Sequence, residues 1–320
     1  EGQSGVGSAS RVDERGKEGM RVKPSLNEDV NEEWIADKTR FIWDGLKSQR
    51  LDHPDVRENG KLRAASWNEA FEAIAAKANS TTPEKMAAIA GDLACVEGMG
   101  ALKDLMTSLG VTSLDCRQDG TKLNAGDRAS YLFNSSIAGI EDADALLIIG
   151  SNPRTEAPVL NARIRKRWSQ GGFPVGIVGE DADLTYDTEH LGAGPQTLKE
   201  IADGSHSFAR VLEVAERPMI ILGQGALTRD DGAAVHATAL QIAEKSGAIS
   251  ANWNGFNVLH TAAARVGGLD LGFVPGEGGK DVAGILDAAA SGDVDFVFLL
   301  GADEIDTSKL EKAFVVYQGT

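Results

Sequence analysis

The sequence predicts an α/β fold with two doubly wound, parallel-sheet units and an irregular N-terminal arm. From residue 84 onward, short apolar runs alternate with stretches of helical periodicity, which is typical of right-handed βαβ units. Nearly all of these runs end in glycine, where a strand would turn into a loop. We therefore expect an arm over residues 1–65, a first Rossmann-like unit over 66–207 and a second over 208–320.

Composition supports a globular chain of about two domains. The 320 residues are 42% hydrophobic and include 37 glycines, so a substantial core is available. The net charge of −16 argues against a nucleic-acid partner, which would require clustered Lys and Arg. The only dense basic run, at residues 163–167, is interpreted as a solvated face or a patch that meets an acidic neighbour, with nucleic-acid contact as the alternative. No apolar stretch is long enough to insert into a membrane, and no signal peptide is visible.

The arm is predicted to be charged and mostly irregular. It contains a short extended piece over residues 21–24 and an acidic stretch over 27–33. The next element is a helix over 67–78, because Ser66 and Glu69 have the spacing of a capping box. Trp67, Phe71, Ile74 and Ala78 share one face of that helix.

The rest of the chain is predicted as alternating strands and helices. The strands are expected at residues 86–90, 145–149, 175–178, 219–222, 296–300 and 314–317. The helices are expected at residues 99–108, 156–168, 233–245, 258–266 and 282–290.

Two glycine-containing loops are the candidate binding residues. The run at 145–149 leads into Gly150-Ser151-Asn152-Pro153, and the run at 219–222 leads into Gly223-Gln224-Gly225. Ligands of open α/β sheets bind at the carboxyl ends of the strands, where glycines let the backbone approach a phosphate. The second loop lacks the third glycine of a dinucleotide fingerprint, because Thr228 stands there. A structural turn and a nucleotide site both remain open for it.

Catalytic and metal-binding residues are not predicted. The five histidines, at 53, 190, 206, 236 and 260, form no pair with the spacing of metal ligands. Arg117 could lower the pKa of the Cys116 thiol, but ordinary burial is the preferred interpretation for Cys116 and for Cys95. The carboxylates at 181, 183 and 187 are interpreted as a solvated loop tip, with a Mg²⁺ site as the alternative. Two cysteines indicate a reducing compartment and are too few for a self-contained iron–sulfur cluster.

The two ends of the sequence suggest a segment of a longer protein. The chain begins at Glu1 without methionine. It stops directly after the apolar run at 314–317, which is typical of a strand whose crossover helix is missing. We therefore expect the second unit to be truncated at its C-terminus.

Several longer runs resemble the molybdopterin oxidoreductase superfamily. They are the stretch from Val30 to Phe41, the stretch from Ser66 to Ala70, and the run from Ser135 to Asp144 that leads into Gly150-Ser-Asn-Pro153. Within this superfamily the chain resembles the G-subunit family of NADH-quinone oxidoreductases, the large peripheral-arm subunits of respiratory complex I. The runs that carry this second likeness lie at residues 27–41, 161–168, 231–234 and 299–303.

The resemblance also identifies departures from the cofactor-binding members. Where those enzymes have a cluster-binding cysteine followed by lysine, glycine and arginine, this chain has Ala36, Lys38, Thr39 and Arg40. Where they have Asp-Pro-Arg for the pterin nucleotide, it has Gly179-Glu180-Asp181. Cys116 falls near a metal-ligand position of some members. Cys116, Gly150, Ser151, Asn152, Gly223 and Gly225 are thus expected to be vestigial binding residues that hold no cofactor.

The resemblance implies a function for the whole assembly: electron transfer from NADH to quinone coupled to proton translocation. This segment would be a cofactor-free scaffold that contacts other peripheral-arm subunits of complex I. The acidic stretch 27–33 and the basic run 163–167 are the surfaces to test for such contacts. The 4Fe-4S and 2Fe-2S clusters are expected in a missing N-terminal part. The expected location is the cytoplasmic face of the bacterial inner membrane, or the matrix face of the mitochondrial one. The alternatives are a pterin-dependent molybdenum or tungsten oxidoreductase of the formate dehydrogenase type, and a nucleotide-binding module that uses Gly223-Gln-Gly225.

Overall fold

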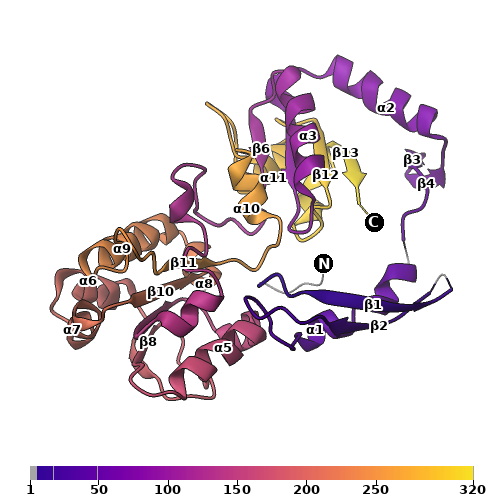
Figure 1. The fold of residues 1–320 in the computed structure, drawn as a ribbon. Coiled ribbons are helices and arrows are strands. Elements are labelled where there is room, and N and C mark those ends of the chain that lie inside the picture. The colour runs from indigo at the N-terminus through magenta and orange to yellow at the C-terminus, as the bar shows by residue number, and fades with distance from the viewer. Residues whose placement is uncertain (1–5, 17, 49, 320) are drawn as a thin grey trace. The chain divides into compact units, whose positions relative to one another are not determined.

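The structure is a computed structural model that describes residues 6–16, 18–48 and 50–319 (Figure 1). Residues 1–5, 17 and 49 of the predicted arm, and Thr320 of the predicted second unit, lie outside this description. The chain forms two compact units. Unit 1 comprises Glu1–Leu46 and Thr121–Ala263, and unit 2 comprises Lys47–Gly120 and Ala264–Thr320.

Unit 1 is built on a five-stranded parallel sheet in the order β11-β10-β7-β8-β9. Its three central strands are buried along their whole length, as the unbroken apolar runs predicted. The strands are β7 (Ala145–Ile149), β8 (Val175–Val178), β9 (Glu189–Gly192), β10 (Pro218–Gly223) and β11 (Phe256–Leu259). The parallel sheet confirms the predicted α/β fold class.

Helices in unit 1 connect these strands. Leu160 and Ile164 of α5 are fully buried in one cluster with Ile148 and Ile177 of the sheet. Burying a side chain of this size stabilises the fold by about 1.5–3 kcal/mol. The helices are α4 (Pro153–Glu156), α5 (Pro158–Trp168), α6 (Pro195–Asp203), α7 (Ser207–Val214), α8 (Gln224–Leu227) and α9 (Gly232–Lys245).

Unit 2 is built on a four-stranded parallel sheet in the order β13-β12-β5-β6. Val297 and Leu299 of β12 and Ile89 of β5 pack with Ile285 of α11 in one buried cluster. The strands are β5 (Met86–Ala90), β6 (Ser113–Asp115), β12 (Phe296–Leu300) and β13 (Phe314–Gln318). The helices are α2 (Trp67–Ser80), α3 (Val96–Ser108), α10 (Arg265–Asp270) and α11 (Val282–Ser291).

The units do not follow the predicted boundaries at residues 65/66 and 207/208. β10 and β11 pair with the sheet of β7, whereas β12 and β13 pair with β5. Each unit is therefore assembled from two separate stretches of chain. Parallel neighbours are joined by long crossovers, so the apolar pattern located most of the sheet strands but could not indicate which strands pair.

The N-terminal arm contains more regular structure than predicted. β1 (Ser10–Arg15) and β2 (Glu18–Pro24) form an antiparallel hairpin, which includes the predicted extended piece at 21–24. The arm continues through α1 (Asp37–Arg40) in unit 1, and a second hairpin of β3 (Asp55–Glu58) and β4 (Lys61–Ala64) belongs to unit 2. The buried side chain of Asn31 fixes the first part, because it accepts from Ala9 N at 2.8 Å and donates to the carbonyls of Ser25 and Trp34.

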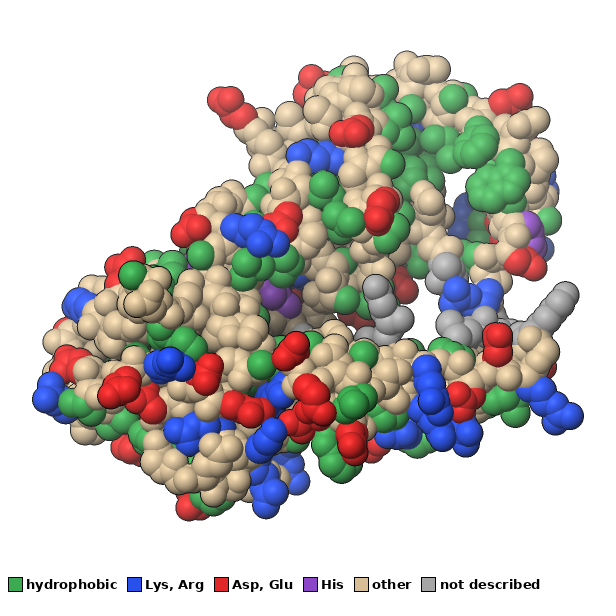
Figure 2. All heavy atoms as spheres, in the orientation of Figure 1, with side chains coloured by type: hydrophobic (Ala, Val, Ile, Leu, Met, Phe, Trp, Pro, Cys, Tyr) green, Lys and Arg blue, Asp and Glu red, His purple; other side chains and the backbone are tan. Residues whose placement is uncertain are grey.

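Two local predictions differ from the structure in informative ways. The helix predicted at 67–78 is present as α2, and the Ser66 side chain accepts from Glu69 N. Its shared apolar face is not buried, however, since Trp67 and Phe71 are exposed, and Figure 2 shows apolar side chains over this helix. The helix predicted at 258–266 is wrong, because β11 ends at Leu259 and α10 begins only at Arg265.

Among the described residues, no helix combines the length and the apolar character that crossing a bilayer would require.

Candidate functional site

The two predicted glycine loops of unit 1 lie side by side. β7 and β10 are neighbours, with Ile149 paired to Leu222, so the loops leave the same edge of the sheet. A Cβ on Gly150 would lie 2.5 Å from Ala226 Cβ, and a Cβ on Gly225 would lie 2.8 Å from Gly150 O. Gly150 also has a φ of +59°, which favours glycine. These glycines allow the loops to pack against each other.

A carboxylate of the chain itself binds the donors of the Gly150 loop. Ser151 Oγ donates to Glu156 Oε2 at 2.9 Å, and Asn152 N donates to Glu156 Oε1 at 2.6 Å. A hydroxyl and a backbone N–H of this kind are the groups that would bind a phosphate in a ligand loop. Here their partner is Glu156, one helical turn further along the chain.

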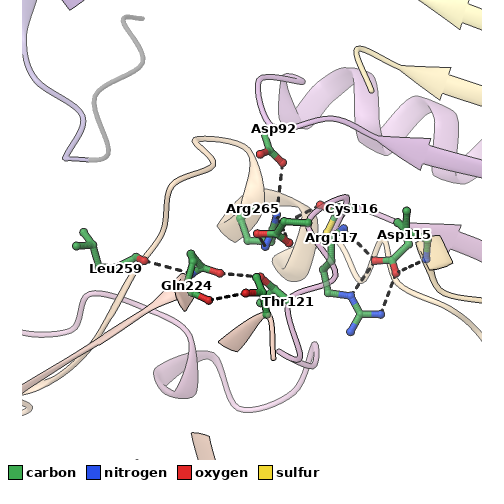
Figure 3. Close-up of polar contacts among 11 residues, drawn as sticks. Asp92, Asp115, Cys116, Arg117, Thr121, Gln224, Leu259 and Arg265 are labelled. Atoms are coloured by element: carbon green, nitrogen blue, oxygen red, sulfur yellow. Dashed lines mark hydrogen bonds and ion pairs between the residues drawn. The ribbon is translucent and has the colours of Figure 1, made fainter. Parts of the chain in front are cut away.

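The Gly223 loop is closed by Gln224. This buried side chain accepts from Thr121 Oγ1 at 2.6 Å and donates to Leu259 O at 3.2 Å (Figure 3). Gln224 is itself the first residue of α8, which has four residues. The Gln224 side chain thus bonds to two other segments of unit 1, which favours the structural-turn interpretation of this motif.

Cys116, the predicted vestigial metal-ligand position, follows β6 in unit 2. Its side chain is 3% exposed, and Gly268 of α10 packs against it so closely that a Cβ there would lie 2.6 Å from Sγ. Burial, reinforced by the charge of Asp115, raises the pKa of the thiol to about 12. Arg117 does not activate this thiol as its position in the sequence suggested, because its guanidinium binds Asp115, with Nε 2.8 Å from Oδ1. Cys116 is a protonated, inaccessible thiol at neutral pH.

Sequence reasoning missed a buried polar cluster next to Cys116. Arg265, at the start of α10, is 1% exposed, and its guanidinium contacts Asp92 and the Cys116 carbonyl (Figure 3). The guanidinium also contacts Asp119. Asp92 follows β5 and Asp119 follows β6, so both carboxylates lie at the carboxyl edge of this sheet. A single arginine has no sequence signature of this role, although an acidic residue shortly after each of two strands was a usable signal.

The other candidate residues are dispersed. Asp183 is exposed and pairs with Arg154 at 2.7 Å; a hydrogen bond from Thr185 N and this ion pair lower the pKa of Asp183. The histidines at 190, 236 and 260 each contact a backbone carbonyl. No group of three or more His, Cys, Asp or Glu suited to a metal occurs within residues 6–16, 18–48 and 50–319.

The acidic stretch and the basic run, predicted as contact surfaces for other subunits, bind each other. Arg163 is 7% exposed; its Nη1 donates to Val30 O at 3.1 Å and its Nε to Glu141 at 2.9 Å. Lys166 pairs with Glu32 and with Glu141. Opposite charges of the two segments therefore neutralise each other within unit 1. The interpretation of the basic run as a patch that meets an acidic neighbour is confirmed.

Ala36 stands where the cofactor-binding enzymes that the sequence resembles have a cluster-binding cysteine. Ala36 is buried at the start of α1, and its methyl side chain cannot bind iron. Residues 3–44 contain neither cysteine nor histidine.

Two family models match this chain. The model described as molybdopterin oxidoreductase matches residues 50–320. The model described as NADH-ubiquinone oxidoreductase NDSU1/NuoG-like, 4Fe-4S domain, matches residues 3–44.

Curated relatives align along nearly the whole chain. It is 47% identical over 316 residues to the protein named NADH dehydrogenase (ubiquinone) iron-sulfur protein 1, mitochondrial, of Solanum tuberosum, and the alignment covers 98% of this chain and 42% of that protein. It is 46% identical over 313 residues to the NADH-quinone oxidoreductase G-subunit of Rickettsia bellii, with 98% of this chain and 44% of that protein covered. The chain therefore spans less than half the length of these relatives.

Proposed function

Since the chain belongs to the molybdopterin oxidoreductase family, we propose that it is a cofactor-free structural body within the G-subunit of an NADH-quinone oxidoreductase. The assembly would transfer electrons from NADH through iron–sulfur clusters to quinone and couple this to proton translocation. This body would fold around its own core and support the cluster-bearing part of the subunit. The names of the relatives support this function over a formate dehydrogenase-like enzyme.

One observation carries the proposal: the groups that would hold a pterin cofactor are bound by the chain itself. Glu156 accepts from Ser151 Oγ and Asn152 N in the Gly150 loop, and the Gln224 side chain is bonded to Thr121 and Leu259. Cys116 is buried beneath Gly268 and remains protonated at neutral pH. These contacts support a chain that holds no pterin cofactor, and we assign no redox step to it.

The iron–sulfur clusters would lie in another part of the subunit. The match of residues 3–44 to a 4Fe-4S domain supports such a neighbour, but a cluster is normally held by several thiolates, which this stretch lacks. The partners would be other peripheral-arm subunits of complex I. The location would be the cytoplasmic face of a bacterial inner membrane, or the matrix face of the mitochondrial membrane.

Elemental analysis tests the absence of a cofactor. The purified 320-residue chain is expected to contain molybdenum, tungsten and iron far below one atom per chain. It is also expected to yield no fluorescent pterin after oxidation. Molybdenum or tungsten at one atom per chain would overturn the scaffold function and favour the pterin-dependent oxidoreductase. A nucleotide-binding module would instead show a rise in melting temperature with NADH or GDP.

A second experiment tests the structural role in the assembled complex. Cys116→Ala in the full subunit removes the thiol near a metal-ligand position, and we expect unchanged NADH-to-quinone electron transfer in isolated membranes. Gly91→Ala is the matched structural variant, because the added Cβ would overlap the Gly301 carbonyl in the core of unit 2. That variant is expected to remove the assembled complex from native gels. Loss of activity in fully assembled Cys116→Ala complex would contradict the proposal.

A further inference from the structure

The buried cluster around Arg265 has the composition of a cation site. The loops that leave β5 and β6 contribute Asp92, Gln118, Asp119 and the carbonyl of Cys116. β5 and β6 are adjacent, with Ile89 paired to Asp115, so their carboxyl ends bring these groups together. Every group contributed by these loops to the cluster offers an oxygen.

The guanidinium of Arg265 occupies the centre of this oxygen cluster. Its Nε donates to Cys116 O at 3.2 Å, and its Nη1 donates to Asp119 Oδ2 at 3.3 Å. Its Nη2 lies 3.0 Å from Asp119 Oδ1 and 3.4 Å from Asp92 Oδ1. One buried positive charge therefore holds two carboxylates and a main-chain carbonyl together.

Gln118 brings one more buried oxygen next to Asp92. Its side chain is 9% exposed, and its amide donates a hydrogen bond to Asp92. This contact fixes the amide orientation, and Oε1 of the same group is buried without a hydrogen-bond partner among the described residues. A buried acceptor without a donor is costly, and the guanidinium of Arg265 does not satisfy this one. A divalent cation in the place of the guanidinium, or a water bound to that cation, would satisfy it.

We propose that Arg265 is the resident cation of a hard-cation site formed by Asp92, Asp119, Gln118 and the Cys116 carbonyl. Carboxylates, an amide oxygen and a main-chain carbonyl are the ligands that Ca²⁺ takes in proteins, and Mn²⁺ shares the preference for oxygen. In the native chain the Arg265 guanidinium supplies the positive charge that such an ion would supply, so the chain binds no exchangeable metal at this position. When the side chain is removed, the site accepts a divalent cation.

The resident charge also positions α10. Arg265 begins this helix, and Gly268, one turn later, covers the Cys116 thiol. Ala264 N donates to Asp92 O at 2.9 Å, and Cys116 N donates to Phe273 O at 3.0 Å, so the segment from 264 to 273 is tied to both strand ends. Arg265 is thus a positioning residue for the segment that seals the carboxyl edge of this sheet.

Arg265→Ala in the 320-residue chain tests the cation site. The variant is expected to melt at a lower temperature than the native chain and to bind one Ca²⁺. At a calcium concentration about tenfold above its Kd, the melting temperature should rise by about 2–4 °C. Mn²⁺ should give one bound ion per chain by electron paramagnetic resonance. The native chain and Arg265→Lys, which keep a cation in place, should show neither response.

The matched control is the triple variant Arg265→Ala, Asp92→Asn, Asp119→Asn. It has the same cavity without the two carboxylates and is expected to bind neither Ca²⁺ nor Mn²⁺. The proposal is overturned if Arg265→Ala folds without binding either ion or if the triple variant binds them equally well. It is also overturned if Arg265→Ala fails to fold at about 10 mM calcium, roughly tenfold above the Kd of the weakest oxygen-ligand sites. None of these outcomes affects the scaffold function, which the Cys116→Ala complex tests separately.

Discussion

Replacing Arg163 by alanine should detach the arm segment around residues 28–32 from the sheet and helices of unit 1. The guanidinium donates to the carbonyls of Glu28 and Val30 in the arm, and to Glu141, which precedes β7. It also lies 3.6 Å from Glu32. No other described arginine or lysine combines this burial with bonds to the arm backbone. The arm therefore depends on this side chain.

The expected loss follows from these contacts. Removing one partner of a buried charge pair costs about 3–5 kcal/mol. Glu32 and Glu141 are partly exposed and can regain water, so we take the lower end of that range. A loss of about 3 kcal/mol corresponds to roughly a hundredfold change in the equilibrium between docked and detached arm.

Hydrogen exchange measures this change locally. The amides of Asn27 and Glu32 are bonded to each other's carbonyls and close the loop whose carbonyls Arg163 holds, so their exchange reports the opening of that loop. In Arg163→Ala these amides should exchange roughly a hundredfold faster, since exchange follows the opening equilibrium, while the amides of β10 keep their protection.

Lys166→Ala is the control on the same helix. Lys166 pairs with the same two carboxylates but is 47% exposed, so its loss should cost only about 0.5 kcal/mol. Unchanged exchange in Arg163→Ala, or an equal effect of Lys166→Ala, would refute the reasoning. An increase spread evenly over the β10 amides would show instead that the substitution destabilises the whole unit.

Further predictions concern unit 2. Iodoacetamide at about pH 8 should modify the exposed Cys95 and spare Cys116, because burial raises the pKa of the Cys116 thiol to about 12. Peptide mass spectrometry identifies the labelled cysteine, and rapid labelling of Cys116 in the native chain would contradict its burial. Between about pH 9 and pH 12 the buried Cys116 thiol keeps its proton in the folded chain, whereas the unfolded chain loses it, so the free energy of unfolding should fall as the pH rises through this range. In denaturant titrations, Cys116→Ser should show a smaller fall over the same range. Gly100→Ala in α3 should stabilise the chain by about 0.5–1 kcal/mol in the same titrations, because the nearest atom to the new Cβ is 3.9 Å away. A lower denaturation midpoint would show that the new methyl group clashes with its neighbours.

The strands of both sheets were largely predictable because burial on two faces leaves unbroken apolar runs. β5, β7, β8 and β12 have the predicted ends. β6 was missed because it has three residues, and β11 was merged into a helix because Phe256–Leu259 runs directly into an alanine-rich stretch. The pairing of β12 with β5 has no local signature, since it joins residues that are far apart in the chain.

The position of the candidate site could be predicted from the sequence, but the side chains that bind its loops could not. The residues at 150–152 and 223–225 were found because glycines after apolar runs mark the carboxyl edge of a sheet. That Glu156 would bind the first loop depends on its side-chain conformation, which periodicity does not encode. The partners of Arg265 lie 146 and 173 residues away, so only the folded chain brings them together.

The order of strands in unit 2 sets the timing of its formation during synthesis. Lys85, just before β5, pairs with Asp295, just before β12, across 210 residues. At ribosomal rates β5 therefore waits roughly 10–40 s for its neighbour. All of residues 121–263 emerge during that interval, so unit 1 can complete its sheet while β5 and β6 still lack β12. Chaperones that shield apolar strands on nascent chains would be needed most over this interval.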